Sequence, residues 1–153
     1  MKNKNFRRSL IDISVHAGTS VIGAVLIYFF YKNPFYILSF FIGSIFIDLD
    51  HFIDYFLYYG FRFNLRKFVG VEYLASGKVY MFIHSWEILI ILLSVSLIFR
   101  LDYLFFFSIG MSIHLLIDTF HEIRPLFYSI FFRMHKKFNA HVLCPNSVAR
   151  LSK

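Results

Sequence analysis

Histidine and carboxylate side chains recur at helical spacing inside the apolar segments of this sequence. His114, Asp118 and His121 are four and three residues apart, so they would form one stripe along a helix. Two other pairs are three residues apart, namely Asp48 with His51 and His84 with Glu87. Imidazole and carboxylate groups without thiolates suit Zn²⁺, Mn²⁺ or Fe²⁺. The pattern therefore predicts a metal centre.

The number of candidate ligands exceeds the need of one ion. A single zinc takes three or four protein ligands. The candidates in the apolar segments are five histidines and five acids, namely His16, His51, His84, His114, His121, Asp48, Asp50, Asp54, Glu87 and Asp118. Two or more ions bridged by a carboxylate would use this surplus, and such clusters activate water for attack on a phosphoester. The single cysteine, Cys144, excludes an internal disulfide and a CxxC motif.

Four apolar segments must position these side chains, and each is long enough to cross a bilayer, which takes roughly 20 residues. The predicted membrane helices cover residues 10–31, 34–59, 79–99 and 102–123. Asn33 and Pro34 provide an N-cap and a first helical position, and Gly60 provides a stop signal. The segment 126–142 mixes phenylalanine with basic residues, which predicts an amphipathic segment in the membrane interface. We therefore expect an all-α integral membrane bundle of four transmembrane helices, forming a single domain over residues 1–153.

The composition agrees with a membrane protein. Hydrophobic residues make up 58% of the chain and charged residues 16%, and the mean hydropathy of +0.63 is too high for an ordinary soluble domain. The net charge is +7, but the basic residues fall between apolar runs, so we expect phospholipid contacts and no nucleic acid. The first apolar run contains Asp12 and His16 and lacks an A-x-A-like cleavage site, which favours a retained helix over a signal peptide.

The distribution of lysine and arginine predicts the orientation. The N-terminus and the loop 61–78 hold four each, and the segment after residue 123 holds six. With four spans, these fourteen of the sixteen basic residues lie on one side, and only Lys32 and Arg100 lie on the other. The positive-inside rule makes the basic side cytoplasmic. We therefore expect a multi-pass protein of the inner membrane with both termini in the cytoplasm.

The same topology gathers the polar residues in one half of the membrane. In an up-down-up-down bundle, the starts of the first and third helices meet the ends of the second and fourth. A charged aspartate near a helix centre costs roughly 2.5–3.5 kcal/mol, so these carboxylates must face the bundle interior, a wet cleft or a bound cation. On a regular helix Asp50 points well away from Asp48. Either the helix is distorted there, or only some of the carboxylates share one centre.

Several of these elements, taken in order, resemble a known family. They are His16 in the first helix, the run Ile47-Asp48-Leu49-Asp50-His51, the pair His84-Ser85, and His114-x3-Asp118. Over about residues 10–125 their order and spacing resemble the YdjM-like family of inner-membrane metal-dependent hydrolases, which is distantly similar to zinc-dependent phospholipase C and the P1-type nucleases. The resemblance implies that the metal ligands are His16, Asp48, Asp50, His51, His84, His114 and Asp118.

The resemblance also sets expectations for chemistry. We expect two or more divalent ions, zinc first among them, and hydrolysis of a phosphoester in a phospholipid or related amphiphile at the cytoplasmic leaflet. Asp50 would bridge ions or add a ligand at the catalytic centre, Glu87 is the candidate general base, and Asp12 could orient the ring of His16. The sequence departs from the family where Val79 and Tyr80 replace a frequent His-Arg pair, and where Ile47 replaces a frequent proline.

Three other interpretations remain open. A pair such as His114 with Asp118 could only hold membrane helices together by a hydrogen bond. Histidines from separate helices could ligate haem, although haem ligation does not need the accompanying carboxylates. An ion or proton transporter also needs intramembrane acids and histidines. It would usually place them near the midplane with a path to both sides, whereas the outer half here is almost purely apolar.

Overall fold

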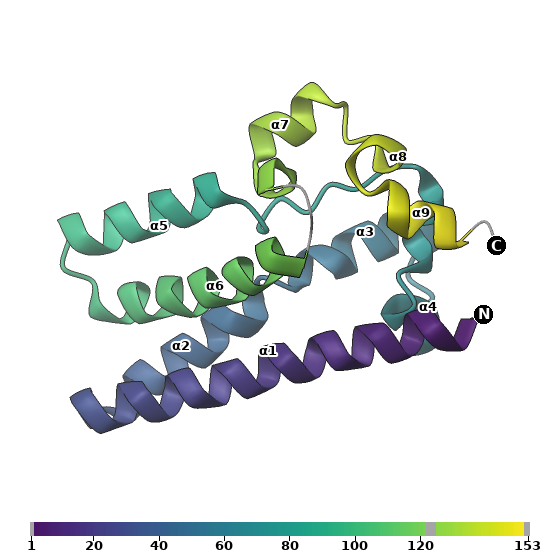
Figure 1. The fold of residues 1–153 in the computed structure, drawn as a ribbon. Helices are drawn as coiled ribbons and strands as arrows, with labels where there is room; N and C mark the ends of the chain where they lie inside the picture. Colours follow the sequence, from purple (N-terminus) through teal and green to yellow (C-terminus); the bar gives the residue numbers. More distant parts are fainter. Residues whose placement is uncertain (1, 122–124, 152–153) are drawn as a thin grey trace.

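The computed structural model describes residues 2–121 and 125–151, and within these ranges its regular elements are helices (Figure 1). Three candidate membrane spans are long and apolar enough to cross a bilayer, namely Ser9–Tyr31, Pro34–Tyr59 and Asp102–Phe120. The predicted all-α class is therefore confirmed. Three of the four predicted membrane segments are long and apolar enough to cross a bilayer, and the predicted helix 79–99 differs as described below.

The first and last predicted membrane helices agree with the structure. Helix α1 (Lys2–Tyr31) contains the predicted helix 10–31 and extends it toward the N-terminus. Helix α6 (Asp102–His121) matches the prediction of 102–123 as far as residue 121, and residues 122–123 lie outside the described part of the chain.

The predicted helix 34–59 is present but broken in its middle. Helix α2 (Pro34–Phe46) begins at Asn33, whose side-chain oxygen accepts a hydrogen bond from the backbone N–H of Phe35 at 3.0 Å. Helix α3 (Leu49–Tyr59) follows after a turn. In the turn, the N–H of Asp48 donates to the carbonyl of Ile45 at 3.1 Å, three residues back rather than four. This tighter winding rotates the helix and changes where Asp48 and Asp50 point.

The predicted helix 79–99 is shorter than expected. Helix α5 covers only Trp86–Ile98, about 20 Å at 1.5 Å per residue, against a hydrocarbon core of about 30 Å. Residues 79–85 are irregular, and Met81 has a φ of 45°, which no right-handed helix accommodates. Ser85 caps α5, because its side-chain oxygen accepts from the N–H of Ile88 at 3.4 Å. The hydropathy of residues 79–85 therefore did not predict their backbone conformation, which is irregular rather than helical.

The remaining helices are short, and most of them lie toward the end of the molecule where both termini lie (Figure 1). In the loop after α3 these are α4 (Leu65–Val69) and η1 (Glu72–Ser76). The C-terminal cap comprises η2 (Pro125–Tyr128), α7 (Ile130–His135), α8 (Ala140–Leu143) and α9 (Pro145–Leu151). The segment 126–142, predicted as an amphipathic segment in the membrane interface, belongs to this cap. It buries Phe127, Arg133 and Ala140, and their burial follows from packing against the loop and the 79–85 segment.

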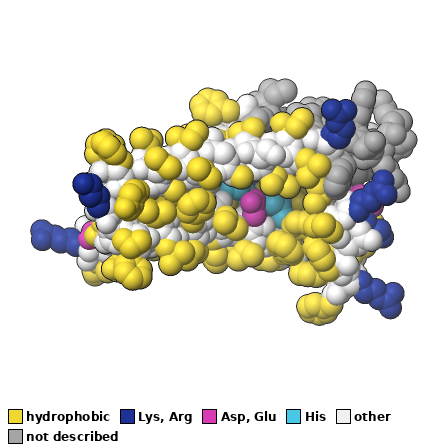
Figure 2. All heavy atoms as spheres, turned by 90° about the horizontal axis from the view of Figure 1, so that it is seen from below, with side chains coloured by type: hydrophobic (Ala, Val, Ile, Leu, Met, Phe, Trp, Pro, Cys, Tyr) yellow, Lys and Arg dark blue, Asp and Glu magenta, His cyan; other side chains and the backbone are white. Residues whose placement is uncertain are grey.

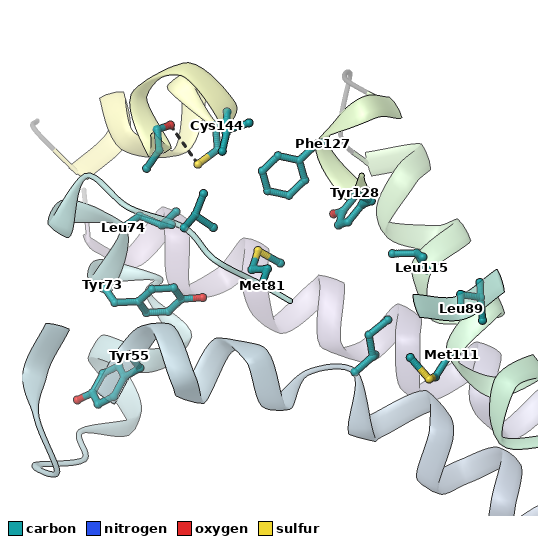
Figure 3. Close-up of a cluster of buried hydrophobic side chains, with 14 residues drawn as sticks. Tyr55, Tyr73, Leu74, Met81, Leu89, Met111, Leu115, Phe127, Tyr128 and Cys144 are labelled. Carbon is teal, nitrogen blue, oxygen red and sulfur yellow. Dashed lines mark hydrogen bonds between the residues drawn. The ribbon is translucent and has the colours of Figure 1, made fainter. Parts of the chain in front are cut away.

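Aromatic and aliphatic side chains from the cap, the loop and the spans meet in one core cluster (Figure 3). Tyr73 of η1, Met81 of the irregular segment, Tyr128 of η2 and Leu115 of α6 all belong to it. The cluster therefore joins segments that are far apart in the sequence, and it fixes the 79–85 segment against the membrane helices.

Helices α2 and α6 approach each other at two glycines. A Cβ atom at Gly43 would meet the carbonyl oxygen of Phe107, and a Cβ atom at Gly110 would meet the carbonyl oxygen of Phe40. Small residues that let helix backbones approach closely are the usual means of association in a bilayer. This contact brings the end of α2 beside the middle of α6.

The surface agrees with insertion in a membrane. Figure 2 shows a face that is largely hydrophobic, with lysine and arginine side chains near its two ends and histidine and acidic side chains near its middle. Large apolar side chains such as Val25, Phe29 and Ile45 are 61%, 72% and 63% exposed. An apolar band between two charged ends is the surface that a bilayer covers.

Candidate metal centre

Four segments bring the predicted ligands together. His16 lies in the middle of α1, Asp48 lies at the break between α2 and α3, His84 lies at the end of the irregular segment, and His114 and Asp118 lie one turn apart on α6. The α2–α6 contact and the break after α2 position Asp48 against α6. The sequence pattern identified these residues, and the structure places all five in one cluster.

Ligand atoms of Asp48, His84 and His114 all lie within 4.8 Å of one another, and an oxygen of Asp118 lies beside both imidazoles. The Nε2 atom of His114 lies 3.3 Å from Oδ1 of Asp48 and 3.5 Å from Oδ2 of Asp118. The Nε2 atom of His84 lies 3.7 Å from the same Asp48 oxygen and 3.6 Å from the same Asp118 oxygen. These lengths are longer than ordinary hydrogen bonds. Each imidazole therefore lies beside both carboxylates without a hydrogen bond of ordinary length.

Four of the six separations among these atoms match those between the ligands of a tetrahedral transition-metal ion. Four nitrogen and oxygen ligands about 2.1 Å from a tetrahedral zinc are about 3.4 Å from one another. The four separations above run from 3.3 to 3.7 Å. The buried Nε2 of His84 also has no hydrogen-bond partner among the described residues. A buried nitrogen without a partner is costly, and a bound cation would satisfy it.

His16 extends the cluster on the far side of Asp118. Its Nε2 atom lies 2.9 Å from Oδ1 of Asp118, the oxygen that does not face His84 and His114. Its ring stacks on that of His114, with 3.9 Å between the centroids. His16, His114 and Asp118 form a second group of possible ligands, so the Asp118 carboxylate could bridge two ions. Asp12, expected to orient His16, has its Oδ1 4.0 Å from the same Nε2.

The Nδ1 atoms of His114 and His84 face oxygen atoms on the side of each ring away from the cluster. The Nδ1 atom of His114 lies 2.7 Å from the backbone carbonyl of Ser44, which can only accept, so Nδ1 carries the proton. The Nδ1 atom of His84 lies 3.4 Å from Oδ2 of Asp50. In the neutral His114 ring, Nε2 is then the nitrogen without a proton and faces the carboxylates of Asp48 and Asp118, as in metal-bound histidines.

His51 borders the cluster. Its Nε2 atom lies 3.8 Å from Oδ1 of Asp48, and its Nδ1 atom lies 2.7 Å from the hydroxyl of Tyr73. Burial raises the pKa of Tyr73 well above its ordinary value, so this hydroxyl stays protonated and can orient the ring. No local pattern in the sequence identifies Tyr73, because its role depends on the contact between η1 and α3.

Asp50 lies behind His84 rather than among the converging atoms. Its Oδ2 atom accepts the backbone N–H of His84 at 2.7 Å as well as facing the ring nitrogen. One turn later, both carboxylate oxygens of Asp54 accept the backbone N–H of Tyr80, at 3.2 and 3.0 Å. The two α3 carboxylates therefore hold the irregular segment through its N–H groups.

Arg133 of the cap holds the same segment through its carbonyl groups. The guanidinium donates to the carbonyl oxygens of His84 at 2.9 Å, Met81 at 2.8 Å and Phe127 at 2.9 Å, and the side chain is fully buried. Burial lowers the pKa of Arg133, and the carboxylates of Asp50 and Glu87 oppose that shift. In the sequence, Arg133 is one of the six basic residues after residue 123 that predict the orientation, and no local motif distinguishes it from its exposed neighbours.

Glu87, the candidate general base, contacts the cap. Its Oε1 atom accepts from the Ser129 hydroxyl at 2.5 Å, and its Oε2 atom accepts from the N–H of Ile130 at 3.0 Å. Both oxygens therefore hold the start of α7. The side chains of His121 and Glu122 lie outside the described residues.

Comparisons with models of known families, with curated proteins and with solved structures found no match to this chain.

Proposed function

We propose that this protein is a membrane-embedded, metal-dependent hydrolase of phosphoester bonds. The observation that carries the proposal is that Nε2 of His84 and Nε2 of His114 each lie 3.3–3.7 Å from one oxygen of Asp48 and one oxygen of Asp118. Two buried imidazoles with orienting partners and two carboxylates are the donor set of a zinc, manganese or iron(II) site.

The chemistry follows from that donor set. A divalent cation held there, for which we expect zinc, would lower the pKa of water and stabilise charge on a phosphoester oxygen. Asp118 would share its second oxygen with His16, and His51 lies beside Asp48, so a second ion is part of the proposal. In the reaction, a water oxygen bonds to phosphorus, the bond from phosphorus to the alcohol oxygen breaks, and the alcohol takes up one proton.

We further propose four membrane crossings, with α5 and the 79–85 segment together forming the fourth. Irregular backbone at membrane depth is tolerated where protein groups satisfy it, as Asp50, Asp54 and Arg133 do here. Four crossings place both termini and the loop 61–78 on one side, and the lysine and arginine distribution makes that side cytoplasmic. The resemblance to the YdjM-like family supports an inner-membrane location and a phospholipid or related amphiphile as substrate.

Metal analysis of the purified protein tests the site. We expect His114→Ala and Asp118→Ala to lose bound zinc while still inserting in the membrane. His135→Ala is the matched control, because His135 is an exposed histidine in the cap. Unchanged metal stoichiometry in the His114 and Asp118 variants would refute the assignment.

Lipid mass spectrometry tests the reaction. Zinc-loaded wild-type protein in mixed-phospholipid vesicles should release phosphoester products, and the His114→Ala variant should not. Stoichiometric metal without any product would refute the hydrolase and would favour the transporter interpretation of the same cluster.

A further inference from the structure

The candidate metal centre is exposed on one side only. The side chains of His84 and His114 are 0% and 4% exposed, whereas that of Asp48 is 47% exposed. His51 is 29% exposed, and Asp12 is 46% exposed beside His16. The site is therefore reached from the side on which Asp48 and Asp12 lie.

The opposite side is filled by the core cluster (Figure 3). Tyr73 contacts His51, and the ring of Tyr128 lies 6.3 Å from that of His84. Tyr73 and Tyr128 are 2% and 5% exposed, and the fully buried Arg133 lies behind His84. The cap and the loop thus cover the site at the end of the molecule that carries most of the basic residues.

The open side faces an apolar surface. Figure 2, seen from below the view of Figure 1 and so from the side away from α7 and α8, shows histidine and acidic side chains in the middle of a hydrophobic face. Ile45 and Leu49, one on each side of the α2–α3 break, are 63% and 43% exposed beside Asp48. Such a surface on membrane-spanning helices is covered by lipid chains.

We propose that the site opens sideways into the bilayer, so that a phospholipid presents its phosphate to the centre while its acyl chains remain on the apolar face around Ile45 and Leu49. This inference rests on the proposed function and adds the route of the substrate, which reaches the centre from within the leaflet rather than from the water. The basic ends of the apolar face suit the charge of an anionic lipid. A lipid that reaches the site from the side keeps its chains buried throughout.

A binding measurement tests this opening without relying on turnover. Protein loaded with Mn²⁺ and freed of excess ion is placed in nanodiscs of phosphatidylcholine and phosphatidylglycerol. Paramagnetic relaxation of the lipid ³¹P signals then reports phosphates that reach the centre. We expect enhanced relaxation for the lipid, none for soluble glycerophosphoglycerol, and loss of the lipid effect in His114→Ala.

Two bulky substitutions locate the path. Leu49→Trp should abolish the lipid relaxation while retaining Mn²⁺, and Leu38→Trp, at an exposed position far along α2, should leave it intact. Ile45→Trp replaces the first variant if Leu49→Trp fails to fold.

Equal relaxation of the soluble phosphodiester, or full lipid relaxation in both blocking variants, would overturn the proposal. Lipid relaxation without hydrolysis would instead sustain the sideways opening and remove only the hydrolase.

Discussion

Replacement of Arg133 by glutamine tests how the centre is held together. The guanidinium makes three buried hydrogen bonds of 2.8–2.9 Å to main-chain carbonyls, two of them in the segment that carries His84. Hydrogen bonds to charged groups contribute about 1.5–3 kcal/mol each but do not add. The loss also leaves Asp50 and Asp54 without their nearby positive charge. Removal of one partner from a buried charged network costs about 3–5 kcal/mol, which is the expected loss of stability.

That loss is large enough to measure. For a chain of this length, 1 kcal/mol lowers the unfolding temperature by about 2–4 °C, so Arg133→Gln should unfold roughly 6–20 °C below the wild type. Thermal unfolding in detergent, followed by circular dichroism with and without zinc, gives the shift. Arg66→Gln is the matched control, because Arg66 is exposed on α4 and should change stability by no more than about 0.5 kcal/mol. If Arg133→Gln unfolds at the same temperature as the wild type and keeps its metal, the hydrogen bonds of Arg133 do not stabilise the 79–85 segment as we propose.

Three further substitutions probe the packing around the site. Gly110→Leu should separate α2 from α6 and destabilise the protein by about 1–3 kcal/mol or more. Gly18→Leu should not, because no atom lies within 4 Å of the added Cβ. Equal unfolding temperatures of the two variants would contradict the close contact between α2 and α6. Tyr73→Phe should weaken zinc binding about 10–100-fold, because it removes the hydroxyl that orients the ring of His51. Tyr58→Phe, at an exposed position, should leave the zinc affinity unchanged. Equal zinc affinity of the two variants in a competition titration would exclude this orienting role. Glu87→Gln should lower the unfolding temperature but retain zinc and hydrolysis, because both oxygens bind the start of α7; loss of hydrolysis with zinc retained would restore it as the general base.

The break at Ile47–Asp48 shows what periodicity could and could not predict. The sequence raised a conflict, since a regular helix cannot direct Asp48 and Asp50 to one place. The structure resolves it with a tight turn that sends Asp48 into the centre and Asp50 behind His84. Asp48 and Asp50, two residues apart, therefore contact different partners. The sequence left two alternatives, a distorted helix or carboxylates that do not all share one centre, and the structure shows both.

The 79–85 segment differs most from the sequence-based prediction, because it is irregular where a helix over 79–99 was expected. Its residues are apolar enough for a membrane helix, but its N–H groups bond to α3 carboxylates and its carbonyls bond to Arg133. These partners lie at least 26 residues away, so no local pattern reveals them. The same contacts explain why Arg133 is buried although its sequence context is basic.

The sequence by itself determined the helical class, the membrane-spanning segments at 10–31, 34–59 and 102–123 to within a few residues, and the identity of the clustered histidines and aspartates. Hydropathy and helical spacing are local properties, and they fix which residues share a helix face. Only the tertiary structure decided which atoms converge, that Asp50, Tyr73 and Arg133 support the ligands, and that the centre opens toward Asp48. Those outcomes depend on contacts between distant segments, where one buried charge or one close helix crossing outweighs local preference.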